Sequence, residues 1–370
     1  MSKNEEKDFD NNLKEIKELS KRLQEPLEEP ITILYFDQKQ EKIKYKGRLV
    51  DDKYAGLGIL YNENGEGIKY NGYFSNNEYN GFGNEYINNK LNYEGYFENG
   101  KKHGKGLLYY NNNEKIYFNG IFDMDNYIEG VLYDPDGNKI YEGIFKNNRP
   151  KEGKNIKLYN LNGELEYKGD LLDSLFHGYG ILYEKGKYEE NRIFSEYKYL
   201  KYEGEFKEND YNGFGKLYID HYLGKYLLYE GNFKNNLFYG NGKIYYQNKN
   251  ICYDGEFSSN KLNGKGIKYY KNGKIKIKGL FEDNKCIEGE YYNPDGLNIY
   301  KGEFMNDIPK EAQNIIIYDD NTNKKYEGEI HNGNYEGEGI EYDSLIKNKI
   351  LFQGNFKDKH NWNRQNGCVF

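Results

Sequence analysis

Cysteine and proline are scarce in this sequence, with three and six copies among 370 residues. Cys252, Cys286 and Cys368 share no CxxC spacing, so the sequence predicts neither a disulfide framework nor a zinc site. We expect these cysteines to be reduced thiols.

Groups suited to catalysis are also few. The chain has five histidines, eight serines and two threonines. Its nearest Ser-His-Asp set is Asp173, Ser174 and His177, which turn chemistry explains better than a catalytic triad does. We therefore expect no catalytic residue, no metal and no cofactor, and hence no enzyme.

Long apolar runs and clustered charge of one sign are missing as well. No stretch of about 18 apolar residues is present that could cross a membrane. The 53 basic and 60 acidic side chains are mixed along the chain and give a net charge of -7. Binding of nucleic acid or of an anionic membrane by charge alone would need clustered Lys and Arg. We expect a cytoplasmic protein, free or associated with the cytoskeleton or a membrane, without a nucleic-acid partner.

Glycine and tyrosine, in contrast, are abundant, at 43 and 42 residues. This composition favours β-structure with many tight turns and an aromatic core. The residues follow a repeat, in which an aromatic or aliphatic residue is followed two positions later by glycine. Successive copies lie 23 to 27 residues apart, with one gap of 35. The thirteen copies begin at Tyr45, Tyr70, Tyr93, Phe118, Tyr141, Tyr167, Tyr202, Tyr229, Tyr253, Ile277, Tyr300, Tyr326 and Phe352.

Each copy predicts a strand, a turn and a second strand. In the second copy, the period of two places Tyr70, Gly72 and Phe74 on one face of the sheet and Asn71 and Tyr73 on the other. Eight copies continue with a Gly-x-Gly pair and a tyrosine, and stretches such as Asn99-Gly100 between the strands predict hairpin turns. A single hairpin could not be stable alone, so the hairpins must stack on one another.

The segment from Tyr93 to Tyr109, YEGYFENGKKHGKGLLY, resembles the MORN repeat (membrane occupation and recognition nexus). The resemblance extends over about residues 45–356. It implies an all-β, elongated, open solenoid of about thirteen stacked antiparallel β-hairpins. It implies function only loosely, because such arrays occur in protein scaffolds, in cytoskeletal and membrane-contact proteins and as appendages of enzymes.

A longer repeat indicates an internal duplication, since residues 118–183 align without gaps on residues 277–342. The copies share Pro-Asp-Gly turns at Pro135 and Pro294. They also share Pro-Lys-Glu segments that begin at Pro150 and Pro309, where the Gly-x-Gly pair is incomplete. We expect equivalent bends or partner-contact sites at these two places.

Two terminal segments lie outside the repeats. Residues 10–24 place Leu13, Ile16, Leu19 and Leu23 on one helical face. We expect residues 1–40 to form a short helix and a capping strand, with a partner-binding helix as the alternative, residues 41–356 to form the solenoid, and residues 357–370 to form a C-terminal cap. An insertion at residues 185–200 should lengthen one hairpin.

The function expected from these patterns is that of a non-catalytic scaffold or adaptor that binds a protein partner along one face or at the ends of the solenoid. A membrane-associated module that binds acidic lipids is one alternative, and an acidic rod that inhibits a nucleic-acid-binding protein is another. No motif identifies the partner or the oligomeric state. The candidate partner-binding residues are Tyr73, Tyr96, Tyr179, Trp362, Lys151, Glu152, Lys310 and Glu311.

Overall fold

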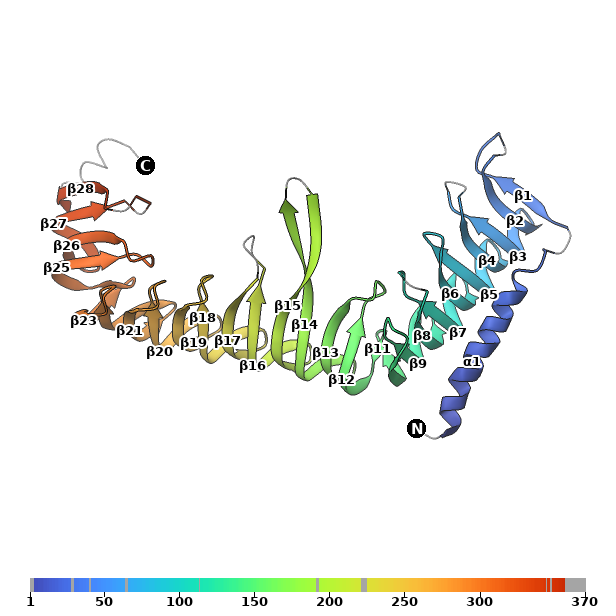
Figure 1. The fold of residues 1–370 in the computed structure, drawn as a ribbon, viewed down its shortest axis with the longest axis horizontal. Coiled ribbons are helices and arrows are strands. Elements are labelled where there is room, and N and C mark those ends of the chain that lie inside the picture. Colours follow the sequence, from blue (N-terminus) through green and yellow to red (C-terminus); the bar gives the residue numbers. More distant parts are fainter. Residues whose placement is uncertain are drawn as a thin grey trace. The chain divides into compact units, whose positions relative to one another are not determined.

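In the computed structural model, the chain forms two compact units, Met1–Leu182 and Tyr183–Phe370, and each is described by itself. The structure describes residues 3–27, 30–39, 41–63, 66–112, 114–190, 193–220, 225–343, 345–346 and 348–356. Figure 1 shows the ribbon, in which one helix accompanies a long series of short strands.

Unit 1 starts with the helix and continues with strands in chain order. Its elements are α1 (Lys3–Arg22), β1 (Thr32–Tyr35), β2 (Ile43–Val50), β3 (Lys53–Tyr61), β4 (Ile68–Ser75), β5 (Glu78–Ile87), β6 (Lys90–Glu98), β7 (Lys101–Tyr109), β8 (Ile116–Asp123), β9 (Asn126–Tyr133), β10 (Lys139–Lys146), β11 (Arg149–Pro150), β12 (Glu152–Tyr159), β13 (Leu165–Leu172) and the first half of β14 (Leu175–Glu190). Neighbouring strands are antiparallel, and the sheet from β1 to β11 is open.

Unit 2 holds the remaining strands. They are the second half of β14, β15 (Ile193–Lys207), β16 (Asp210–Ile219), β17 (Tyr226–Lys234), β18 (Leu237–Tyr245), β19 (Ile251–Ser258), β20 (Lys261–Tyr269), β21 (Ile275–Glu282), β22 (Lys285–Tyr292), β23 (Asn298–Met305), β24 (Ile308–Pro309), β25 (Glu311–Tyr318), β26 (Lys324–His331), β27 (Asn334–Tyr342) and β28 (Ile350–Asn355). The insertion at residues 185–200 lengthens β14 and β15 to 16 and 15 residues, as predicted.

The predicted stacking of antiparallel hairpins is confirmed. Twelve of the thirteen copies supply a pair of strands, whereas the copy at Phe352 supplies only β28 among the described residues. The expected C-terminal cap, residues 357–370, lies outside the described residues.

Glycines of successive strands face one another across the sheet, and we call this row the glycine line. In unit 1, Gly72 pairs with Gly83, which in turn pairs with Gly95. A Cβ added at Gly95 would lie 2.6 Å from Cζ of Tyr93 and 2.7 Å from the Cα of Gly106. Any side chain here would collide with the ring or with the neighbouring strand, so each close pair requires glycine.

We call the face of the sheet that carries both the glycine line and the aromatic rings the inner face. On it, Tyr70 is fully buried, stacks on Tyr79 at a centroid distance of 3.8 Å and meets Phe74 edge-on. The ring lies over the glycines, and its hydroxyl donates a hydrogen bond to the carbonyl oxygen three residues later. The same bond is made by Tyr45, Tyr70, Tyr93, Tyr141, Tyr167, Tyr202, Tyr229, Tyr253, Tyr300 and Tyr326.

The turns within the hairpins have the backbone geometry that their residues favour. Asn76 and Asn77 both have positive φ, as do Asn99 and Gly100, which is the geometry of a type I′ turn. In addition, the side chain of Asn77 accepts a hydrogen bond of 2.7 Å from the backbone N–H of Tyr54 in the preceding hairpin. The turns thus also link neighbouring repeats.

The sheets are interrupted at the two Pro-Lys-Glu segments, the places at which the sequence predicts equivalent bends or partner-contact sites. Pro150 and Pro309 are buried and end β11 and β24, and a new sheet starts two residues later in each unit. Loops about fifty residues apart then meet. In unit 1 the backbone N–H of Asn111 donates a hydrogen bond of 2.8 Å to the backbone carbonyl of Leu161. In unit 2 the backbone N–H of Lys271 donates one of 2.8 Å to the backbone carbonyl of Asp320. We call these places the two bends.

The predicted short helix and capping strand of residues 1–40 are both present, and the strand, not the helix, covers the end of the sheet. Instead, α1 lies across strands β5 to β8, and the end of the sheet is covered by β1, which pairs with β2 (Figure 1). The physical reason is that an edge strand needs backbone hydrogen bonds, which a strand supplies, whereas the apolar stripe of a helix needs an apolar surface.

Candidate partner-binding face and core cavity

The outer face of each sheet is formed by the residues that flank the glycine line. Because side chains alternate along a strand, the residues before and after each glycine point away from the aromatic core. In unit 1 this outer face binds α1. Ile16 of the helix and Leu23 directly after it are buried against Phe82 and Leu107, which are 6% and 0% exposed. The predicted apolar stripe of the helix is therefore used within the chain.

Polar side chains fix the helix in one register. Asn12 donates a hydrogen bond of 2.7 Å to the side-chain oxygen of Asn119, and Asn84 donates one of 2.6 Å to the hydroxyl of Ser20. Asn84 and Asn119 both lie next to the glycine line. These hydrogen bonds add to the apolar contacts of the stripe in holding α1 on the outer face of unit 1.

Two charged side chains of the helix are paired as well. Glu15 forms an ion pair of 2.7 Å with Lys105, and Lys17 forms one of 3.1 Å with Glu94. The hydroxyl of Tyr109 donates a hydrogen bond of 3.1 Å to Glu94. Burial, and next the charge of Glu94, raises the pKa of Tyr109 above its ordinary value, so the phenol stays a neutral donor.

The outer face of unit 2 carries an open groove of about 790 Å³ over β20 to β23. Its walls are the residues that flank Gly266, Gly279, Gly289 and Gly302. They include Lys265, Ile267, Lys278, Leu280, Glu288 and Glu290. The groove therefore lies on the same side of the glycine line as α1 does in unit 1.

The first strand of this groove shares a Gly-Lys-Gly segment with the strand at the centre of the α1 site. Gly-Lys-Gly at residues 104–106 is followed by Leu107, and Gly-Lys-Gly at residues 264–266 is followed by Ile267. Lys105 and Leu107 hold α1, whereas Lys265 is exposed and Ile267 is partly exposed. Unit 2 thus repeats the Gly-Lys-Gly segment that lies under α1 in unit 1.

The rings that were predicted to be exposed differ in their exposure. Tyr73 and Tyr179 are 46% and 55% exposed, as expected. Tyr96 is only partly exposed, because it packs edge-on against Phe82 beside α1. Trp362 lies outside the described residues.

Sequence reasoning missed Phe214, which is 50% exposed. It occupies the middle of a Gly-x-Gly pair, as Phe82 does under α1. The alternation of faces could have identified it, because every middle residue of such a pair points to the outer face.

The four charged candidates lie at the surface of the two bends. Lys151 and Glu152 are exposed, and Lys310 forms an ion pair of 2.6 Å with Glu303. Glu311 accepts a hydrogen bond from the backbone N–H of Asn332 and pairs with His331, and these contacts lower the pKa of its carboxyl group. The structure brings each Lys-Glu pair to a bend but does not bring the pairs to the outer groove.

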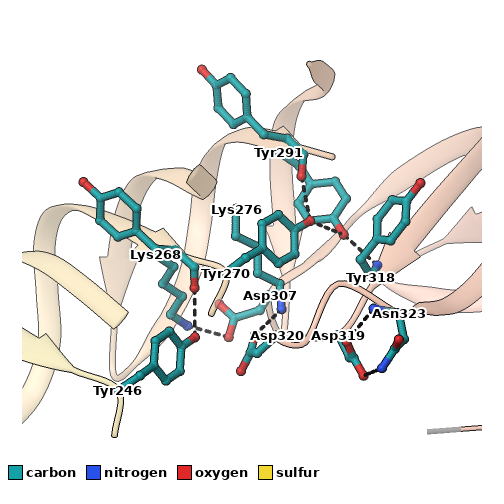
Figure 2. Close-up of polar contacts among 12 residues, drawn as sticks. Tyr246, Lys268, Tyr270, Lys276, Tyr291, Asp307, Tyr318, Asp319, Asp320 and Asn323 are labelled. Atoms are coloured by element: carbon teal, nitrogen blue, oxygen red, sulfur yellow. Dashed lines mark hydrogen bonds and ion pairs between the residues drawn. The ribbon is translucent and has the colours of Figure 1, made fainter. Parts of the chain in front are cut away.

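A second hollow lies on the inner side of the bend in unit 2, where a cavity of about 450 Å³ is lined by tyrosines and by aliphatic and charged residues. Figure 2 shows the ion pairs of Lys268 with Asp307, at 2.7 Å, and of Lys276 with Asp320. The backbone N–H of Tyr318 donates a hydrogen bond of 2.9 Å to the hydroxyl of Tyr291 (Figure 2).

The residues considered for catalysis have structural contacts. Ser174 donates a hydrogen bond of 3.2 Å to the carbonyl of Arg149, and Asp173 pairs with Lys146. Within the described part of the chain, no group of three or more His, Cys, Asp and Glu residues is arranged to hold a metal ion. Over the same residues, no helix has the length and apolarity needed to span a membrane.

Comparison with known families identifies the repeat. The family model described as "MORN repeat" matches residues 70–90, 93–115, 167–188, 202–220, 229–251, 253–275 and 326–344. A comparison with curated proteins gave no significant match. The matched segments coincide with hairpins that have a full Gly-x-Gly pair, and the unmatched segments include both bends.

Proposed function

The chain is a MORN-repeat protein, and on this basis we propose that it is a non-catalytic cytoplasmic scaffold that holds helical segments of partner proteins on the outer faces of its sheets. The observation that carries this proposal is the binding of α1 in unit 1. There, three apolar residues of one amphipathic helix and Leu23 directly after it are packed on residues beside the glycine line, and polar contacts set the register.

The groove in unit 2 supports the same function for a partner from outside the chain. It offers Ile267 and Leu280 as apolar contacts, and Leu280 is 40% exposed. Such contacts favour the apolar stripe of an amphipathic helix.

The charges beside the groove indicate the chemistry of the partner. Lys265 corresponds in position to Lys105, which pairs with Glu15 of α1. A second lysine, Lys278, lies on the next strand of the groove, while Glu288 lies further along. We therefore propose a partner helix with an acidic residue beside its apolar stripe, facing Lys265, and a basic residue towards Glu288.

Site-specific photo-crosslinking tests this function. A photoreactive residue at Leu280, in the full-length protein in its host cell, should capture a protein segment that has an apolar stripe and an acidic flank. The matched control is Ile87, which is 48% exposed at the end of β5 and away from the groove. Lys265→Glu should reduce capture at Leu280 several-fold and leave capture at Ile87 unchanged.

The proposal fails if Leu280 captures no more protein than Ile87, or if the captured segments have no amphipathic helical pattern. Sedimentation with vesicles that contain phosphatidylserine serves as the companion measurement. Strong, salt-sensitive binding of the purified protein to these vesicles would favour the acidic-lipid alternative.

A further inference from the structure

The bend in unit 2 leaves part of a strand edge unpaired. In the regular repeat that starts at Tyr253, the two strands of the hairpin, β19 and β20, pair at five positions. At the bend, β23 pairs with β24 at two positions only, Phe304 and Met305. On the side away from β22, the edge of β23 from Asn298 to Gly302 therefore has no strand beside it among the described residues.

A second edge is open on the other side of this bend. β25 starts a new sheet and pairs with β26, and no strand of the described chain pairs with its other edge. The two open edges border one hollow of about 280 Å³. Ile299 and Tyr300 of β23 line it, together with residues 312–316 of β25.

The backbone of β23 directs hydrogen-bonding groups to the open side. The carbonyl oxygen of Glu303 accepts a hydrogen bond of 2.8 Å from the backbone N–H of Lys310, which comes from the bend. Residues two apart in a strand direct their N–H and C=O groups to the same side, so those of Lys301 point to the open edge as well. An edge of this kind is a template for an additional strand.

Side chains around the hollow are open to solvent. Ile299 is 37% exposed. On the opposite side, Gln313 and Asn314 are exposed and Ile316 is partly exposed. An incoming strand can therefore contact these four side chains without entering the core.

The lining differs in charge between the two bends. At three positions unit 1 has the charged residues Asp134, Lys154 and Lys157, where unit 2, with the offset of 159 residues, has Asn, Gln and Ile. None of the described residues that line the hollow of unit 2 is charged. The adjacent Lys301 pairs with Glu290 at 3.3 Å. A charged side chain that entered this hollow would lose water without gaining a partner, so the lining favours an uncharged occupant.

We propose that the open edge of β23 at the second bend binds an extended, uncharged segment of a partner protein, which joins the sheet as an additional strand. The backbone groups of Lys301 hold the main chain of this segment, and an apolar side chain packs on Ile299 and Ile316. The site adjoins the outer groove at Lys301. It is independent of the helix-binding function, because it uses the backbone at an edge and not the side chains on a face.

Calorimetric titration of the full-length protein with an acetylated and amidated Thr-Val-Thr-Val-Thr peptide tests the proposal. This peptide is uncharged and consists of residues that favour strands. We expect one saturable site with a dissociation constant of about 1 mM or tighter. The same peptide with Glu at its centre should bind at least several-fold more weakly. Absence of saturable binding, or tighter binding of the acidic peptide, would overturn the proposal.

Two further probes separate backbone pairing from apolar contact. Consecutive amides of a strand point to opposite sides, so one probe is N-methylated at the central residue and the other at the residue before it. Both keep every side chain and lose one backbone donor. One of the two should bind at least several-fold more weakly than the parent peptide. Equal binding of all three peptides would show that no strand is added.

A variant that takes its residues from unit 1 tests the selection by charge. Gln313→Lys combined with Ile316→Lys copies Lys154 and Lys157, and therefore has a precedent in the same fold. It should bind the uncharged peptide several-fold more weakly than the wild type does, and the acidic peptide more tightly. An unchanged preference for the uncharged peptide would contradict the role given to the neutral lining.

Hydrogen exchange in the wild type locates the bound peptide and does not depend on the folding of any variant. At saturation, exchange in residues 298–303 should slow at least several-fold, because the N–H of Lys301 gains a partner. The matched control in the same sample is residues 139–144, the equivalent edge in unit 1, where exchange should stay unchanged. Unchanged exchange in residues 298–303, or equal slowing at both edges, would overturn the proposal. Slow exchange there before the peptide is added would mean that another segment already covers the edge, which would overturn it as well.

Discussion

The hydroxyl of Tyr229 donates a hydrogen bond of 2.9 Å to the carbonyl oxygen of Asn232, three residues along the same strand. The bond is possible because the ring lies flat over Gly231 and Gly242, which face each other across the sheet. One tyrosine thus joins the aromatic core to the backbone of its own strand.

The first prediction concerns this hydrogen bond. Tyr229→Phe should lower the free energy of unfolding by about 0.5–1.5 kcal/mol, because only the hydroxyl is lost while the ring remains. Phe118 stands at the equivalent position in another repeat, so phenylalanine fits the site. Urea denaturation measures the change. A loss far above this range would show that the hydroxyl has a further role.

The second prediction concerns the glycine line. Gly242→Ala should destabilise unit 2 by about 1–3 kcal/mol, since a Cβ would meet the Tyr229 ring, with Cζ at 2.5 Å. Asn241→Ala is the control, because this neighbouring side chain is exposed on the outer face. Equal effects of the two substitutions on urea denaturation would contradict the close packing of ring on glycine.

The third prediction concerns α1. Ile16→Asp should destabilise unit 1 by about 2–5 kcal/mol, because it places a charge among buried apolar residues and uncovers Phe82 and Leu107. The control is Lys14→Ala, at an exposed position of the same helix. Hydrogen exchange should show faster exchange in β5 to β8 for Ile16→Asp alone. No change in these strands would mean that α1 contributes little to the fold.

The fourth prediction concerns alkaline pH. Burial raises the pKa of Tyr79 and of Tyr211 to about 12, whereas a tyrosine in the unfolded chain titrates near about 10. The folded state therefore holds these protons more tightly. The stabilising contribution is complete below about pH 10 and is lost as pH rises through about 12.

Urea denaturation from pH 8 to 12, with absorbance at 295 nm to follow phenolate, measures this effect. Stability should be nearly constant to about pH 9 and then fall, and a fraction of the tyrosines should ionise only on unfolding. Ionisation of every tyrosine near pH 10 in the folded protein would contradict the burial of these rings.

The fifth prediction concerns the bends. Charge reversal of Lys151, Glu152, Lys310 and Glu311 should change the free energy of unfolding by no more than about 1 kcal/mol for each surface pair that is lost. If the bends make a partner contact separate from the outer groove, partner capture should weaken while the fold stays intact. Unchanged capture by the folded variant would show that the two segments serve only as bends.

Local pattern determined much of this structure. The spacing of Tyr70, Gly72 and Phe74 fixed the inner face, because side chains alternate along any strand. Asn99 and Gly100 predicted a turn that needs positive φ. The duplicated Pro-Lys-Glu segments marked special places, since proline cannot donate a hydrogen bond to the next strand. Similar reasoning identified the apolar stripe of the N-terminal helix.

Only the tertiary structure shows which other residues these patterns contact. The sequence showed the stripe with Ile16 but not its partner, because Phe82 and Leu107 are far along the chain and become neighbours only when the sheet forms. The burial of Tyr96 beside the helix follows from the same contact. Likewise, Ile277 is an ordinary core residue in the sequence. It borders a cavity together with Tyr253 and Ile317 of other strands, and the space left between them depends on the packing of all of these side chains at once.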